Sequence, residues 1–159
     1  MSLAEQALID LRSAHEYFNR STRNLTEAHS TFAPSAGMMT AAQQVAHVAH
    51  TIDWFIEGAS RPEGFGLDWE AYAKVIDGYT SLDKARAWFE RAVASASAKV
   101  TGMSDADLMA PLPDGPIMGG VPKIAIFGAI VDHTAHHRGA LTVYARLNGI
   151  VPPMPYMEM

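Results

Sequence analysis

Four long stretches of this chain carry apolar residues at helical spacing, and no stretch of any length alternates apolar and polar residues as a strand does. This pattern most restricts the fold, because amphipathic helices without strands must bury their apolar faces against one another. We therefore predict an all-α fold, a four-helix bundle with long loops after its second and third helices. The expected helices run from Ser2 into the twenties, from about 41 to 58, from Ser81 to near Gly102, and from Pro122 to Asn148-Gly149.

Local signals support the ends of these helices. Ser2-Leu3-Ala4-Glu5 and Thr40-Ala41-Ala42-Gln43 are both capping boxes, which begin helices. Pro122 suits a first helical turn, and the glycine of Asn148-Gly149 suits a helix end. Periodicity and caps thus agree on where the chain turns.

The two long connections are rich in glycine and proline. Residues 58–80 hold four glycines and Pro62, which predicts a long loop with one helical turn around Trp69 to Val75. Residues 103–121 hold six further glycines and prolines, which predicts turns or a small hairpin. Long loops in compact domains often carry function, so we expect both to shape a pocket.

The length of 159 residues suits one domain, so we expect residues 1–159 to form a single unit with a core of about 2–150 and a Pro- and Met-rich tail at 151–159. The net charge is −5 and the twelve Lys and Arg form no cluster, which argues against nucleic acid as a partner. No apolar run approaches the roughly 20 residues of a membrane span. The N-terminus lacks the features of a signal peptide, so the expected location is the cytoplasm.

Histidines provide the main chemical signal. His133, His136 and His137 lie within five residues of an otherwise apolar helical segment, and His47 and His50 lie on the second expected helix. Residues three or four apart share a helix face, so two imidazoles at that spacing can bind one metal ion. From spacing alone, His133 could pair with either His136 or His137, and the third ligand could be His47 or His50.

Other features of the sequence exclude several kinds of metal site. The chain has no cysteine, so any ligands are imidazole or oxygen. His133 is followed by Thr134 rather than the glutamate of a zinc protease, and no Glu-x-x-His motif of di-iron bundles is present. We expect His15 and His29 to be packing residues outside the site.

The pattern His133-x-x-His136-His137-Arg138-Gly139, followed by the double proline Pro152-Pro153, resembles the DinB/YfiT-like group of bacterial proteins. The segment Thr40 to Trp54, which contains His47, resembles the other histidine segment of that family. The resemblance covers most of the chain. It implies a four-helix bundle with a divalent metal held by His47, His133 and His137.

The resemblance also implies a function. Three imidazoles leave the metal an open coordination position, which is typical of a catalytic site. Some relatives are similar to thiol-dependent transferases or isomerases, so the leading hypothesis is a metal-dependent transferase or hydrolase that activates a low-molecular-weight thiol, water or another small substrate. Its metal is expected to be zinc or nickel, with iron or manganese as alternatives. His50, His136 and Arg138 are candidates for supporting the ligands or contacting substrate.

The competing hypothesis is a non-catalytic, stress-associated bundle that binds a metal or ligand. In that case the ion serves stability or sensing. The family resemblance and the apolar content favour a homodimer under either hypothesis.

Overall fold

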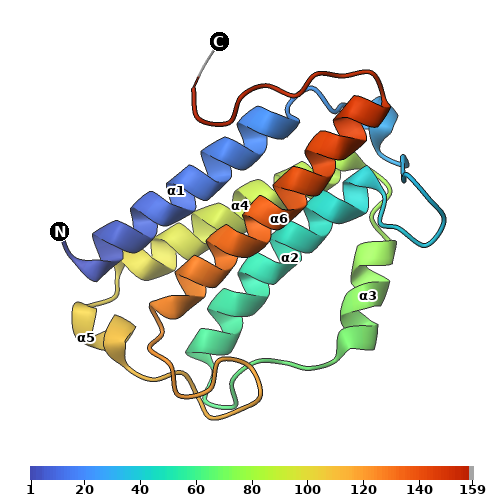
Figure 1. Ribbon diagram of the computed structural model, residues 1–159. Helices are drawn as coiled ribbons and strands as arrows, with labels where there is room; N and C mark the ends of the chain where they lie inside the picture. Colours follow the sequence, from blue (N-terminus) through green and yellow to red (C-terminus); the bar gives the residue numbers. More distant parts are fainter. Residues whose placement is uncertain (158–159) are drawn as a thin grey trace.

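The structure is a computed structural model that describes residues 1–157 (Figure 1). Over these residues it is all-helical, which confirms the predicted fold class. The elements in chain order are α1 (Leu3–Thr22), the 3₁₀ helix η1 (Glu27–His29), α2 (Ala41–Ser60), α3 (Trp69–Asp77), α4 (Leu82–Thr101), α5 (Asp105–Met109) and α6 (Ala125–Leu147).

The long helices α1, α2, α4 and α6 form the bundle. Helix α1 packs against α4 and α6, and α2 packs against the same two helices, so the order around the bundle is α1, α4, α2, α6. Helices α1 and α6 run in one direction and α2 and α4 in the other (Figure 1). Because α2 and α4 are parallel neighbours, the chain between them must travel back along the bundle.

That return is made by residues 61–81, which include α3. Helix α3 has nine residues, so it is longer than the single turn expected around Trp69 to Val75. Asp68 caps it, since the carboxylate accepts a hydrogen bond from the backbone of Ala71 at 3.0 Å. Among the helices, α3 packs mainly on α2, and it stands apart from the bundle in Figure 1.

The capping boxes form as expected. The hydroxyl of Ser2 accepts from the backbone of Glu5 at 3.1 Å, and that of Thr40 accepts from the backbone of Gln43 at 3.3 Å. The expected start of the last helix at Pro122 is wrong, because α6 begins at Ala125.

Tertiary pairing explains the later start of α6. The backbone N–H of Leu112 donates to the carbonyl of Val121 at 2.8 Å, and that of Lys123 donates to Ala110 at 3.0 Å. Residues 121–123 are thus held in an extended pairing with 110–112, which includes a β-bridge between Pro111 and Pro122. The expected turns are present here, but the segment also contains the short helix α5, which the sequence did not predict.

The core fills the space between the four long helices. Its largest fully buried side chains include Leu11 and Phe18 of α1, Phe89 of α4, and Leu141 and Tyr144 of α6. No helix among residues 1–157 has the length and hydrophobicity that crossing a membrane requires.

The chain after α6 folds back over α1. The guanidinium of Arg138 lies 5.8 Å from the ring of Tyr17 and 5.9 Å from that of Tyr156, which are cation–π distances. Arg20 also donates to the carbonyl of Pro155. These contacts hold the tail against the end of the bundle, where Figure 1 shows it crossing from α6 toward α1.

Candidate metal centre

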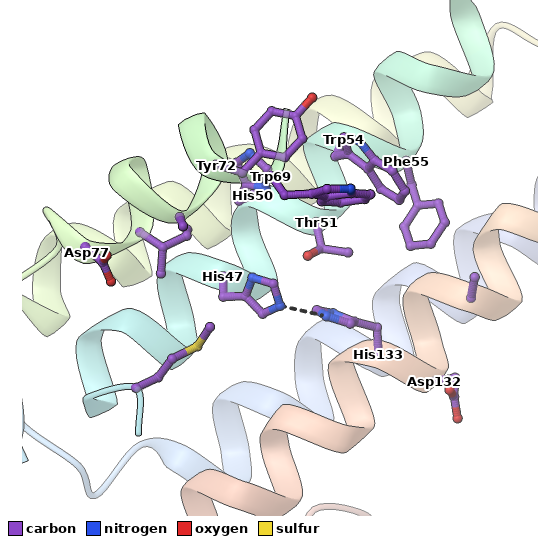
Figure 2. Close-up of a pocket in the computed structure, with 14 residues that line it drawn as sticks. His47, His50, Thr51, Trp54, Phe55, Trp69, Tyr72, Asp77, Asp132 and His133 are labelled. Carbon is purple, nitrogen blue, oxygen red and sulfur yellow. Dashed lines mark hydrogen bonds between the residues drawn. The ribbon is translucent and has the colours of Figure 1, made fainter. Parts of the chain in front are cut away.

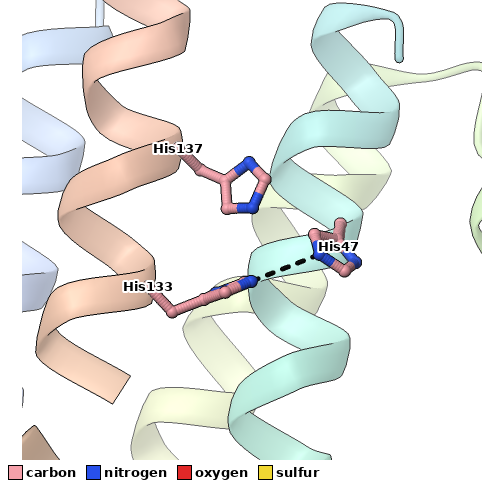
Figure 3. A group of neighbouring side chains, drawn as sticks. All are labelled: His47, His133 and His137. Atoms are coloured by element: carbon pink, nitrogen blue, oxygen red, sulfur yellow. Dashed lines mark hydrogen bonds between the residues drawn. The ribbon is translucent and has the colours of Figure 1, made fainter. Parts of the chain in front are cut away.

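Three imidazoles from two neighbouring helices meet inside the bundle. His47 comes from α2, and His133 and His137 come from consecutive turns of α6 (Figure 3). One ring nitrogen from each of the three lies within 4.8 Å of the others, so the group could hold a metal ion. The ring centroids stand 4.5 to 4.9 Å apart.

The spacing between two of the rings is close to that of metal ligands. The Nε2 atoms of His47 and His133 are 3.2 Å apart. Two nitrogens bound to one tetrahedral zinc ion at about 2.05 Å are about 3.3 Å from each other. The donor set therefore fits a divalent ion of the kind that imidazole prefers.

A hydrogen-bond chain determines which nitrogen of His137 is free. The hydroxyl of Tyr144 donates to the carbonyl of Met39 at 2.8 Å, so its oxygen must accept the bond from the side-chain amide of Gln44 at 3.3 Å. The carbonyl Oε1 of Gln44 then faces Nδ1 of His137 at 2.5 Å. Since that carbonyl can only accept, Nδ1 carries the proton and Nε2 of the neutral ring keeps its lone pair. This is the second contact that metal-binding histidines usually make.

Burial keeps the group uncharged. It lowers the pKa of His133 to about 4, with His47 and His136 adding to the effect. It lowers the pKa of His137 to about 3, with His133 and His47 adding to the effect. The pKa of His47 is lowered mainly by burial as well. All three rings are therefore neutral at pH 7, which is the form that binds metals.

A cavity of about 550 Å³ borders the histidines between α2, α3 and α6 (Figure 2). His47 and His133 line it, whereas the more buried His137 lies behind them. An ion held by the three rings would thus lie next to a space large enough for a small organic molecule. The residues that line the cavity are Met39, His47, His50, Thr51, Trp54, Phe55, Trp69, Tyr72, Ala73, Ile76, Asp77, Ala129, Asp132 and His133.

The other predicted site residues lie elsewhere. His50 lines the cavity one turn beyond His47, with its ring 4.8 Å from that of Tyr72. Its pKa is lowered by burial, which outweighs the opposite effect of Asp53 and Glu57. His136 is exposed on α6, with its ring 4.9 Å from that of His137.

Arg138 does not line the cavity, because it lies between Tyr17 and the tail. His15 and His29 are also outside the group. His15 bonds to Glu90 at 2.6 Å, and Nδ1 of His29 accepts from the backbone of Thr26 at 3.0 Å. The structure therefore brings together three of the six candidates, places His50 on the cavity wall, and leaves His136 and Arg138 outside that wall.

The sequence alone did not indicate the role of Gln44 or the aromatic residues Trp69 and Tyr72 that line the cavity. Gln44 precedes His47 by three residues, so helical spacing alone puts both on one face of α2. Trp69 and Tyr72 were expected in a loop with one helical turn, and nothing in their local pattern indicates that they face His47. Their position depends on the path of residues 61–81 back along the bundle.

Comparison with known proteins places the chain in a family. No curated protein matches it. Solved structures with a similar fold include a DinB-like protein from Bacillus cereus ATCC 10987, with 20% identity and a TM-score of 0.72 over 94% of this chain and 95% of that one. Another DinB-like protein, from Bacillus subtilis, has 16% identity and a TM-score of 0.70 over 97% and 99% of the two chains. A protein from Streptococcus pneumoniae has 14% identity and a TM-score of 0.68 over 92% and 91%.

At these identities the solved structures show a shared fold, and the sequence itself shows the kinship. A family model described as the DinB superfamily matches residues 10–141. This range includes His47, His133 and His137 and covers most of the chain. The protein therefore belongs to the DinB superfamily.

Proposed function

We propose that this protein is a divalent-metal-dependent enzyme whose metal is held by His47, His133 and His137. The observation that carries the proposal is the set of three neutral imidazoles beside the cavity, one of them already oriented by Gln44. A divalent ion held by three imidazoles keeps an open position and, when bound, acts as a Lewis acid on a thiol, water or substrate. Zinc or nickel suits this donor set best, with iron and manganese as alternatives.

The chain's own residues would orient and shield the reaction. His137 is only 8% exposed and Gln44 is equally buried, so water reaches the ligands mainly from the cavity side. Thr51 and His50 line that side and offer a hydroxyl and an imidazole to a bound molecule. No carboxylate contacts the three histidines through a hydrogen bond within residues 1–157, so a bound thiol or water would lose its proton to solvent or to a base on the cavity wall, which offers His50, Asp77 and Asp132.

Among metal-dependent reactions we propose thiol transfer, in the cytoplasm, with a low-molecular-weight thiol as one substrate. The support is membership of a family some of whose relatives are similar to thiol-dependent transferases or isomerases, together with a cavity that can hold a second, organic substrate. In such a transfer the thiol sulfur bonds to an electrophilic carbon, the thiol proton leaves, and the group on that carbon departs with its electron pair.

The first experiment is metal analysis by mass spectrometry on protein purified without a His tag. We expect near-stoichiometric metal in the wild type and none in His47→Ala or in the His133→Ala/His137→Ala double variant. His50→Ala is the matched control on the same helix and should retain the metal. A wild type that stays metal-free after reconstitution with zinc, nickel and iron would overturn the proposal.

The second experiment separates an enzyme from a bundle that only binds metal. Thiol transfer is followed with 1-chloro-2,4-dinitrobenzene, from which the thiol displaces chloride. An enzyme loses this activity in His137→Ala while the helical signal of the fold is kept. A purely stabilising ion predicts no activity in the wild type and a lower Tm in the variant.

We also propose a homodimer. The support is a pair of apolar side chains one turn apart on α6, Val143 and Leu147, which are 53% and 59% exposed. Light scattering should give twice the chain mass of 17.2 kDa for a dimer, and the chain mass itself would contradict the proposal.

A further inference from the structure

The cavity beside the histidines has an aromatic wall. The rings of Trp54 and Trp69 are 5.8 Å apart, and those of Trp69 and Tyr72 are 5.9 Å apart. The indole N–H of Trp54 donates to the carbonyl of Gly66 at 2.8 Å, which fixes the orientation of that ring. Figure 2 shows the three side chains along one side of the cavity, opposite the pair His47 and His133.

Part of this wall is open to a ligand. Trp69 is 57% exposed, although an indole is among the most costly apolar groups to leave in water. Helix α3, which carries Trp69, packs mainly on α2 and stands apart from the bundle in Figure 1. A flat aromatic molecule in the cavity would cover indole surface that the fold leaves uncovered.

The charges around the cavity are all of one sign. None of its lining residues within residues 1–157 is Lys or Arg. Two of them are aspartates, Asp77 on α3 and Asp132 on α6, which lie on opposite sides of the His47–His133 pair in Figure 2. The whole chain carries a net charge of −5. In the metal-free protein, an anion in the cavity would meet these two carboxylates and no lining Lys or Arg to balance them.

We infer that the cavity binds a small aromatic molecule without negative charge, stacked on Trp69 and Trp54, as the organic substrate of the site. The inference rests on the proposed function only in naming this molecule a substrate. Binding itself depends on the aromatic wall and the two aspartates. A cavity of about 550 Å³ accommodates two fused rings with a short substituent.

The test uses three naphthalene probes that differ mainly in charge: 2-naphthyl methyl sulfone, 2-naphthyltrimethylammonium and 2-naphthalenesulfonate. Sulfonate is chosen as the anion because it is a poor metal ligand, so metal binding does not mask repulsion. Affinity is measured by calorimetry at low salt on the full chain, with zinc and after chelation. We expect the sulfone and the ammonium to bind and, after chelation, the sulfonate to bind about tenfold or more weakly, whereas bound zinc should reduce this difference.

Variants connect this selectivity to the wall and the aspartates. Trp69→Ala should weaken the sulfone and the ammonium by roughly three- to tenfold, the size of one aromatic contact. Val75→Ala is the matched control, because Val75 is an exposed apolar residue of the same helix that does not line the cavity. Asp77→Asn/Asp132→Asn should bring the sulfonate closer to the sulfone in affinity.

Equal affinity for the sulfonate in the chelated protein would overturn the inference, as would no binding of any probe or an equal loss in Val75→Ala. These outcomes can be distinguished from a failure of the metal analysis that tests the proposed function. If the probes bind and the metal analysis finds no metal in the wild type, the proposed function is refuted and this inference is not. A protein that binds metal, but whose chelated form prefers the sulfonate, refutes this inference alone.

Discussion

Gln44 is the residue that orients the candidate metal centre, because it fixes the proton of His137 on Nδ1. Gln44→Ala removes that acceptor, and we expect metal affinity to fall about 10- to 100-fold, as for other groups that orient a ligand. Competition with a chromogenic chelator measures the change. Gln43→Ala is the control on the same helix, since Gln43 caps α2 and does not contact His137. Equal metal affinity in both variants would show that Gln44 does not orient the ligand.

The lowered pKa values of His133 and His137 predict how the metal-free protein responds to acid. Their pKa values are about 4 and 3 in the folded chain, against an unfolded value of 6.5, so the unfolded chain binds more protons between these limits. The free energy of unfolding therefore falls as the pH drops from about 6.5 toward 4. Urea unfolding of chelated protein at pH 7.5, 6 and 5 measures this. In the His133→Ala/His137→Ala variant the slope over this range should be smaller.

At the scale of single residues, helical spacing alone leaves two choices of metal ligand open, one on each of the two helices that carry the histidines. His136 and His137 are adjacent, and either can share a face with His133, so only the packing of α6 on α2 separates them. The structure turns His137 inward and leaves His136 exposed. The role of Gln44 depends on Tyr144, which is 100 residues away in sequence.

Among the elements, the junction of α2 with the following loop depends on the absence of a side chain at Gly58. A Cβ atom there would lie 2.2 Å from Cδ1 of Phe65, whose ring packs 4.7 Å from that of Trp54. Gly58→Ala must displace Phe65, and we expect the free energy of unfolding to fall by about 1–3 kcal/mol, as in other overpacked cores. Chemical unfolding monitored by tryptophan fluorescence measures the effect.

The control for this substitution is Gly139→Ala in α6. Nothing lies within 4 Å of a Cβ atom built at Gly139. Alanine should therefore raise the free energy of unfolding by about 0.5–1 kcal/mol, through helix propensity alone. A Gly58→Ala protein as stable as Gly139→Ala would contradict the packing argument.

The long helices could be predicted because each has its own periodicity and its own cap. The short elements could not. Helix α5 has five residues, too few to show a period, and the start of α6 is decided by the pairing of 121–123 with 110–112. Pro122 suits a helix start locally, but here it belongs to that pairing.

For the whole molecule, a metal held between α2 and α6 would link the second helix of the bundle to its last. A ligand that binds only the folded chain stabilises it by about 4 kcal/mol at a free concentration of about 1,000 times Kd. In a protein of this size each kcal/mol changes Tm by about 2–4 °C, so chelation should lower Tm by roughly 8–16 °C. Differential scanning calorimetry with and without chelator measures the shift. The His133→Ala/His137→Ala variant should show no shift, and an equal shift there would contradict the link.

The bundle was predictable from four apolar helix faces, but the order of the helices around it was not. Periodicity indicates which face of a helix is buried, not which neighbour covers it. The parallel pairing of α2 with α4 leaves α3 on the outside of α2 and so creates the cavity. The pocket is thus a property of chain topology, which no local pattern in the sequence records.

The return segment between α2 and α4 has a consequence for how such a protein diversifies. All three candidate ligands lie on the two helices that meet inside the bundle, whereas Trp69, Tyr72 and Asp77 lie on residues 61–81. Surface connections tolerate substitution and insertion far better than packed helices do. The candidate metal centre and much of the selectivity that we propose for the cavity thus lie on separate stretches of chain. Exchanging one surface segment should redirect the protein to a new molecule while the chemistry stays the same.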